Sequence, residues 1–125
     1  MAKYVDGFVL PVPKKSIDAY RRMSREMGKL MKKYGALEYV EAEGDDLNPK
    51  MMGMRFVKFP QLAKAKPGET VLFSFIVFKS RAHRDKVNAM VMSDPIMTDP
   101  KWKDKPMPFD MKRMSYGGFK TIVDL

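Results

Sequence analysis

The chain has 125 residues, a net charge of +9 and no cysteine. This length suits a single hydrophobic core, and we expect residues 1–125 to form one domain. Without cysteine the chain has no disulfides, thiol nucleophiles or thiolate metal ligands, and one histidine leaves no ligand set for structural zinc. We therefore expect neither a metal nor a cofactor.

The start of the chain does not resemble a secretory signal. Residues 1–6 include an acid where a signal peptide needs its apolar run. The longest uncharged stretch in the predicted sheet region, residues 70–78, is far shorter than the ~20 residues of a membrane-spanning helix. We expect a cytoplasmic protein without a membrane partner.

The first two predicted elements are a strand and a helix. Residues 3–12 alternate as a strand does, and Pro11 and Pro13 indicate that its far end is not centrally paired. A helix follows, with Ser16 as its N-cap and Gly35 as its C-terminal stop. Its apolar residues recur at threes and fours and form one stripe: Ile17, Tyr20, Met23, Met27, Leu30, Met31 and Tyr34.

A second strand and a long loop come next. Residues 36–42 predict a strand with Tyr39 and Glu38 on opposite faces. From residue 43 to residue 69 no periodicity holds, and prolines interrupt the stretch, so we expect a loop with short extra structure near residues 54–59.

The third strand, residues 71–78, leads into a second helix. Ser80 is its predicted N-cap, and the helix runs to about Ser93, where Asp94-Pro95 closes it. Residues 96–111 are rich in proline and lysine and predict a connecting segment.

Residues 114–123 form the last predicted strand. Gly117-Gly118 inside it predict a bulge or a close approach of backbone. The complete order is β-α-β-β-α-β, the ferredoxin-like pattern of an α+β fold with a four-stranded antiparallel sheet.

The third strand gives the strongest indication of assembly, because neither of its faces is polar. Val71, Phe73, Phe75 and Val77 alternate with Leu72, Ser74, Ile76 and Phe78. Such a strand is covered on both sides, yet two helices cover only one face of the sheet. We infer that a second copy covers the other, so that the protein is a homodimer of the dimeric α/β barrel type.

Four strings in the chain resemble one known family. They are YVDGFV at residues 4–9, GALEYVE at residues 35–41, KSRAHRD at residues 79–85, and MPFD with KRM and YGGF within residues 107–119. Together they resemble the YbaA-like family of small bacterial proteins, a domain of unknown function. The resemblance implies a dimeric α/β barrel fold and brings no activity with it.

His83 and Asp6 are the predicted catalytic residues. His83 shares the apolar face of the second helix with Val87, Met90 and Val91, and Asp6 lies on an apolar strand face, where an acid needs a partner. His83 would act as a base or orienting donor with Asp6 as its partner. The alternative is a structural histidine, bonded to a backbone carbonyl or to Asp6.

Four further residues are predicted to contact a ligand. Arg84 is a candidate partner for Asp6, and Asp110 either faces a pocket or anchors the segment before the last strand. Tyr39 and Tyr116 either face a pocket or pack within the sheet. We place the predicted pocket between the sheet and its helices, with residues 45–59 near its mouth.

An acidic run and the methionines allow two interpretations each. The run lacks the ligand spacing of a calcium loop, so we favour a solvated acidic edge over a cation site. The thirteen methionines predict core and interface packing, with lining of an apolar pocket as the alternative. The acidic run consists of Glu38, Glu41, Glu43, Asp45 and Asp46.

The predicted function is a homodimer that binds a small apolar or aromatic molecule. By analogy of fold alone, an enzymatic version would be a cofactor-independent oxygenase or isomerase. A haem-binding version would make His83 the axial ligand, and a dimer with a binding or stress role and no chemistry is a further alternative. The alternative is a nucleic-acid-binding or protein-binding dimer that uses a basic helix face. The cations of that face are Arg21, Arg22, Arg25, Lys29, Lys32 and Lys33.

Overall fold

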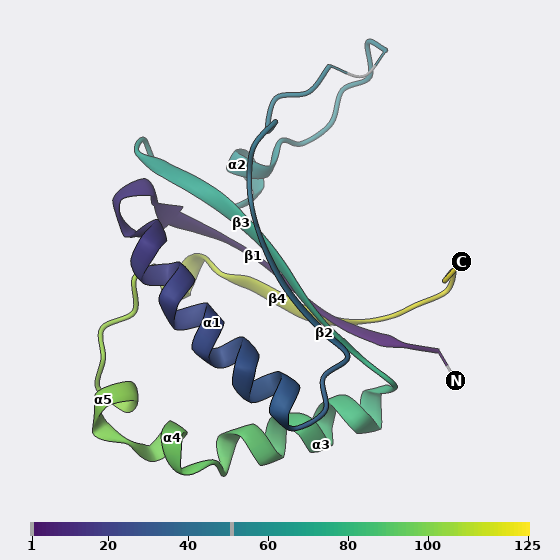
Figure 1. Cartoon of the computed structure of the whole chain (residues 1–125). Helices are drawn as coiled ribbons and strands as arrows, with labels where there is room; N and C mark the ends of the chain where they lie inside the picture. The colour runs from purple at the N-terminus through teal and green to yellow at the C-terminus, as the bar shows by residue number, and fades with distance from the viewer. Residues whose placement is uncertain (1, 51) are drawn as a thin grey trace.

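Four strands form one antiparallel sheet in the computed structural model, which describes residues 2–50 and 52–125 (Figure 1). They lie across the sheet in the order β2-β3-β1-β4. Their bounds are Tyr4–Pro13 for β1, Glu38–Glu43 for β2, Glu69–Phe78 for β3 and Ser115–Lys120 for β4. The β-α-β-β-α-β order predicted from the sequence is confirmed.

The two prolines of β1 lie where the strand has a single neighbour. Pro11 and Pro13 pair with β3, whereas β4 reaches only as far as Val9. The far end of β1 is therefore not centrally paired, as predicted, and the missing proline N–H groups break no ladder on the β4 side.

Helices α1 (Ile17–Lys33) and α3 (Arg81–Met92) cover the same face of the sheet (Figure 1). Ser80 caps α3 as predicted, because its Oγ accepts a hydrogen bond of 3.1 Å from the backbone N–H of His83. Ser16 occupies the N-cap position of α1 as predicted, although its side chain makes no capping hydrogen bond. It closes a short 3₁₀ turn, η1 (Lys14–Ser16), which already leads the chain into the helix.

Gly35 ends α1 with left-handed backbone, at a φ of 117°. The turn is closed by Ala36 N–H, which donates to Met31 O at 3.0 Å, and by Gly35 N–H, which donates to Lys32 O at 3.2 Å. This is the glycine stop predicted from the sequence, and it directs the chain straight into β2.

The hydrophobic core lies between the helices and the sheet, in two clusters. One joins α1, β3 and α3 through residues such as Leu30, Phe78 and Val87, and the other joins β1, β3 and α1 through Leu10, Leu72 and Tyr20. The space between the two clusters is where the cavity described below is found.

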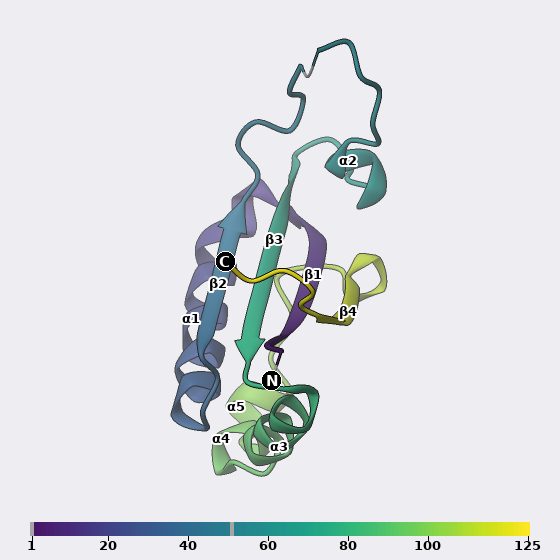
Figure 2. The ribbon, with the colours of Figure 1, turned by 90° about the vertical axis from the view of Figure 1, so that its right-hand side faces the viewer.

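The long connection between β2 and β3 projects beyond the sheet (Figure 2). It ends in a single helical turn, α2 (Phe59–Leu62), whose Phe59 ring packs edge-on against Phe73 with centroids 6.2 Å apart. Phe73 lies on the face of the sheet away from α1 and α3. The connection therefore lies beside the uncovered face, and the expectation that residues 45–59 border the pocket between sheet and helices is wrong.

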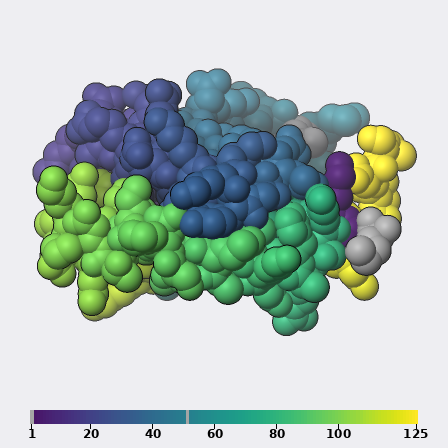
Figure 3. Space-filling view, turned by 60° about the horizontal axis from the view of Figure 1, so that its bottom comes forward, coloured from purple at the N-terminus to yellow at the C-terminus, as the bar shows by residue number. Residues whose placement is uncertain are grey.

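Two short helices follow α3 where the sequence predicted only a connecting segment. They are α4 (Pro95–Thr98) and α5 (Pro100–Lys103), and each begins with an Asp-Pro pair. The Asp94 and Asp99 carboxylates accept backbone N–H bonds at the two N-termini, both at 2.9 Å. Figure 3 shows the surface of α1 meeting that of α3 to α5 along one seam.

The last strand is shorter than predicted and contains no bulge. Its pairing with β1 runs in register through Gly7–Gly117 and Asp6–Gly118. The second predicted possibility was a close approach of backbone, and what lies close to the backbone at Gly118 is a side chain: the Tyr4 ring occupies the space where a side chain at Gly118 would lie.

Candidate functional site

A cavity of about 300 Å³ lies between α1, the sheet and the segment that follows α4. Its wall is mostly apolar, with seven of the thirteen methionines among its lining residues. Aromatic rings come from every side, and the only tryptophan of the chain, Trp102, is one of them. The full lining consists of Phe8, Leu10, Tyr20, Met23, Ser24, Met27, Met31, Tyr39, Glu41, Ser74, Ile76, Met97, Trp102, Met107, Phe109, Met111 and Met114.

Glu41 is the one carboxyl group among these lining residues. Its Oε1 accepts a hydrogen bond of 2.9 Å from the Tyr20 hydroxyl, and its Oε2 accepts one of 3.3 Å from Tyr39. Burial raises the pKa of Glu41, while the hydroxyls of Tyr20, Tyr39, Ser74 and Ser24 act in the opposite direction. Burial also raises the pKa of both tyrosines, so they remain protonated donors.

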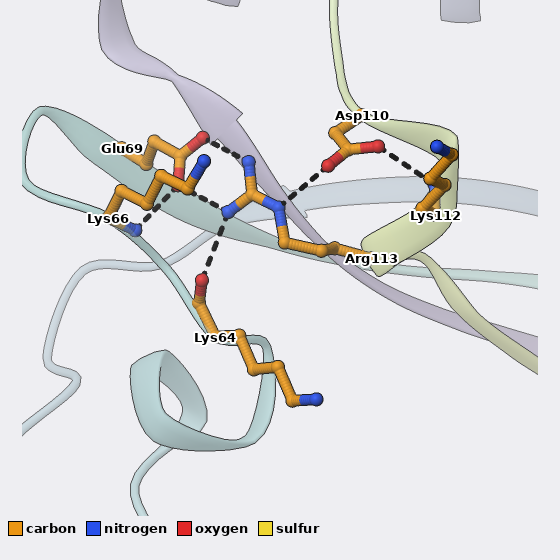
Figure 4. A network of polar contacts seen from close by, with 6 residues as sticks. All are labelled: Lys64, Lys66, Glu69, Asp110, Lys112 and Arg113. Atoms are coloured by element: carbon orange, nitrogen blue, oxygen red, sulfur yellow. Dashed lines mark hydrogen bonds and ion pairs between the residues drawn. The ribbon is translucent and has the colours of Figure 1, made fainter.

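An arginine-centred network holds the outer wall of the cavity in place (Figure 4). Arg113, in the 3₁₀ turn η2 (Met111–Arg113), binds both carboxylate oxygens of Glu69 at 2.6 and 2.7 Å. It also donates to Asp110 Oδ2 and to Lys64 O, both at 3.0 Å. Because Met111 and Met114 lie on either side of Arg113 in the sequence and line the cavity, the network ties the wall to the start of β3.

Three of the predicted site residues meet in a second polar cluster. Arg84 Nη1 donates to Asp6 Oδ1 at 2.8 Å and to the Tyr116 hydroxyl at 3.0 Å. The guanidinium also lies 5.0 Å from the centroid of the Tyr4 ring. Burial raises the pKa of Asp6, which is 2% exposed, and the charge of Arg84 opposes that rise. Arg84 thus supplies the partner that the sequence required for Asp6.

His83 does not bond to Asp6. Its Nδ1 accepts a hydrogen bond of 3.0 Å from the backbone N–H of Lys79, and its ring packs edge-on against Phe78 with centroids 6.0 Å apart. A nitrogen that accepts a hydrogen bond carries no proton of its own, so the neutral imidazole is protonated on Nε2. The catalytic role predicted for His83 and Asp6 stays a prediction, and neither residue lines the cavity.

Tyr39 and Asp110 lie apart from that cluster. Tyr39 lines the cavity and bonds to Glu41, whereas Asp110 caps η2 through Lys112 N–H at 3.0 Å and pairs with Arg113. Asp110 therefore anchors the segment before the last strand, one of its two predicted roles. Sequence reasoning missed Glu41, Tyr20 and Trp102 as a group, although alternation along β2 places Glu41 on the same face as Tyr39.

Two features of the described residues bear on the class of site. Across residues 2–50 and 52–125, no three His, Asp or Glu side chains gather as metal ligands. Over the same part of the chain, no helix has the length and apolar character needed to cross a bilayer.

Helices on one face of a four-stranded antiparallel sheet in this order define a ferredoxin-like protein. A solved structure described as a dimeric ferredoxin-like protein from an uncultured marine organism matches over 100% of both chains, with a TM-score of 0.57 and 12% identity. At 12% identity, the similarity to this solved structure shows the fold alone.

The family is shown by closer relatives. Residues 3–111 match the family described as "Protein of unknown function (DUF1428)". The uncharacterised protein YbaA of Escherichia coli strain K12 is 43% identical over 122 residues, which cover 98% of each chain, and YbaA of Shigella flexneri gives the same values. The chain belongs to this family, and the YbaA-like resemblance noted in the sequence is confirmed.

Proposed function

We propose that the protein is a homodimer that binds a small apolar or aromatic molecule in the methionine-lined cavity. The cavity itself supports this proposal most directly. Its volume of about 300 Å³ lies at the lower end of the ~300–1,000 Å³ typical of ligand pockets. Thioether side chains adapt to the shape of an apolar guest and make favourable contacts with aromatic rings.

The wall of the cavity also supports a route of entry. A smaller hollow of about 60 Å³ shares Met23, Trp102 and Met107 with the cavity and lies between α1 and residues 102–108. A ligand that enters here would pass the Trp102 ring, whose fluorescence therefore reports on occupancy.

The uncovered face of the sheet supports the homodimer. Phe73 is 47% exposed and Phe119 62% exposed on this face, around a shallow hollow of about 620 Å³. An exposed aromatic patch of this kind, here on the central strand β3 and the edge strand β4, is typical of an interaction surface. The solved relative by fold is described as dimeric.

An enzymatic version of this function is cofactor-independent chemistry on the bound molecule, of the oxygenase or isomerase type. Within the cavity it would use Glu41 and the two tyrosines. If His83 and Asp6 take part in catalysis as predicted, they act outside the lining described above, Asp6 from the Arg84 cluster and His83 from its position beside Phe78.

The ligand proposal is tested by the emission of Trp102 during titration with aminoanthracene, a flat apolar probe. We expect a saturable change, and we expect Met27→Phe to weaken binding because the larger, stiffer side chain fills part of the cavity. Met92→Phe, at a position 64% exposed, is the matched control and should bind as the wild type does. A Trp102 signal that does not respond, or that responds equally in Met27→Phe, would contradict the proposal.

A second candidate is nucleic-acid or acidic-protein binding by the basic face of α1. Arg21, Arg25, Lys29 and Lys32 line an open groove of about 770 Å³ along β2, which favours a polyanion over other partners for this surface. Contacts of this kind are made to phosphates without sequence preference and weaken steeply with salt. Specific RNA binding that survives ~0.2 M salt would place this function above the ligand proposal.

A further inference from the structure

The carboxyl group of Glu41 lies where two hollows meet. Ser24, Tyr39 and Glu41 line both the methionine-lined cavity and the groove beside β2. Glu41 faces Ser74 across the β2–β3 pair. On the cavity side its neighbours are apolar or carry hydroxyls, and the groove side includes four cations and one acid, Glu38.

No counter-charge neutralises this carboxylate directly. Within the part of the chain that the structure describes, none of the ion pairs includes Glu41. Asp6, by comparison, is buried with Arg84 bonded to it. Burial makes the Glu41 carboxylate a stronger base by raising its pKa, and the hydroxyls bonded to it oppose that rise, while no ion pair adds to their effect.

The charged and titratable groups around Glu41 are few. From α1 comes the Tyr20 hydroxyl, with Arg21, Arg25, Lys29 and Lys32 across the groove. Tyr39 comes from β2 itself, together with Glu38 at the groove. The segment after α4 contributes only apolar groups to the lining, Trp102 and Phe109 among them.

We propose that Glu41 is the proton acceptor of this cavity, and that the bound molecule is an aromatic or apolar carbonyl compound with an acidic α-hydrogen, which the protein interconverts between its keto and enol forms. This inference rests on the proposed ligand-binding function and names its substrate class and chemistry. The lining offers no cysteine, lysine or histidine, and a carboxyl group that accepts hydrogen bonds from two phenols is suited to proton transfer.

The reaction balances without a further reactant. The Glu41 carboxylate takes the proton from the α-carbon, the C–H electron pair becomes the C=C bond, and the carbonyl π pair moves to oxygen. A tyrosine hydroxyl hydrogen-bonds to that oxygen as its charge develops, and the positive groove favours the enolate. The proton held by Glu41 is then delivered to the oxygen, so an isomer leaves and the carboxylate is restored.

The test uses phenylpyruvate, an aromatic carbonyl compound whose own carboxylate suits the cationic groove. Loss of enol absorbance and uptake of solvent deuterium at the α-carbon are followed with and without protein. We expect clear acceleration by the wild type and a loss on the order of 10²-fold or more in Glu41→Gln, as for removal of a general base. Glu43→Gln, at an exposed position two residues along β2, is the matched control and should retain the wild-type rate.

A second variant separates catalysis from folding. Tyr39→Phe keeps the carboxyl group and removes one hydrogen bond that stabilises its charged form, so the pKa of Glu41 should rise. The pH at which the rate reaches half its maximum should therefore move upward, which a purely structural bond between Tyr39 and Glu41 would not cause. An unmoved pH profile would overturn the inference even if Glu41→Gln failed to fold.

The emission of Trp102 distinguishes the two levels of the proposal. If it responds to phenylpyruvate while the rate stays that of buffer, the proton-transfer inference is wrong and ligand binding stands. If it responds to aminoanthracene alone, the assigned substrate class is wrong. If it responds to neither compound, ligand binding in the cavity fails, and this inference fails with it.

Discussion

Gly28 determines how closely α1 approaches the sheet. A Cβ at this position would lie 2.6 Å from Cδ1 of the Tyr39 ring. The contact is at the ring rather than at the end of a flexible chain, and the ring is held by the bond from its hydroxyl to Glu41. The absence of a side chain at Gly28 thus permits the geometry around Glu41.

We predict that Gly28→Ala destabilises the protein even though alanine is the better helix former. Helix propensity would favour alanine by about 1 kcal/mol, but displacement of Tyr39 should cost more, and we expect a net loss of roughly 1–3 kcal/mol, as for other overpacked sites. Urea unfolding measures the change, with Arg22→Ala on the exposed side of α1 as the control. A stabilised Gly28→Ala variant would show that the ring moves freely.

Single residues were predictable where physical chemistry demanded a partner. An acid on the apolar face of β1 required one, and Arg84 was among the candidates for Asp6. Glu41 was missed because four other acids surround it in sequence, which gives the appearance of a solvated edge. The alternation of Glu41 with Tyr39 was visible in the sequence. The other hydroxyls around its carboxylate come from α1 and β3, and only the folded chain brings them together.

At the scale of elements, the Arg113–Glu69 pair makes the outer wall of the cavity sensitive to acid. Bonding to Arg113 lowers the pKa of Glu69 from 4.5 to about 2. Because the folded pKa lies below the unfolded value, the unfolded chain binds more protons between the two values. The stabilisation by this pair is therefore complete above about pH 4.5 and declines as the pH falls toward 2.

We predict that Glu69→Gln removes this part of the acid response. The variant should be less stable than the wild type at neutral pH, and the difference should shrink as the pH falls through that window. Denaturant midpoints measured at several pH values test this, with Glu26→Gln on the surface of α1 as the control. A difference that stays constant with pH would contradict the assignment.

Elements with a long apolar period were predictable, and short ones were not. The stripe of α1 and the alternation of β1 and β3 extend over enough residues to specify their structure. Helices α2, α4 and α5 have one turn each, so no period can develop, and local capping maintains them instead. Asp99-Pro100 repeats the pattern of Asp94-Pro95, and this repetition is the sequence signal that could have indicated two helix starts, although Asp94-Pro95 was interpreted as a helix end.

At the scale of the whole molecule, β3 has apolar side chains on both faces, and α1 and α3 cover only one of them. Val71 and Val77 are buried within the chain, but Phe73 between them is half exposed. The sequence alone could predict that the second apolar face of β3 needs to be covered. It could not predict which part of that face stays open, because this depends on where α2 and the ends of the chain lie.

We predict a particle of about twice 14.4 kDa by light scattering after size exclusion. Phe73→Glu should shift it toward the monomer, because a charge buried against a second apolar face is left without a partner. Met92→Glu, on the exposed side of α3, is the matched control and should leave the mass unchanged. A wild type of 14.4 kDa that binds no hydrophobic dye would rule out the homodimer.

The position of β2 at the end of the strand order has a consequence for exchange with solvent. This strand has six residues and is held by β3 alone among the strands of the described chain, so it opens at a lower free energy than β1 or β3. Glu41 moves with it. We therefore expect the amides of β2 to exchange with solvent faster than those of β1 and β3, and we expect each opening of β2 to join the cavity to the cationic groove.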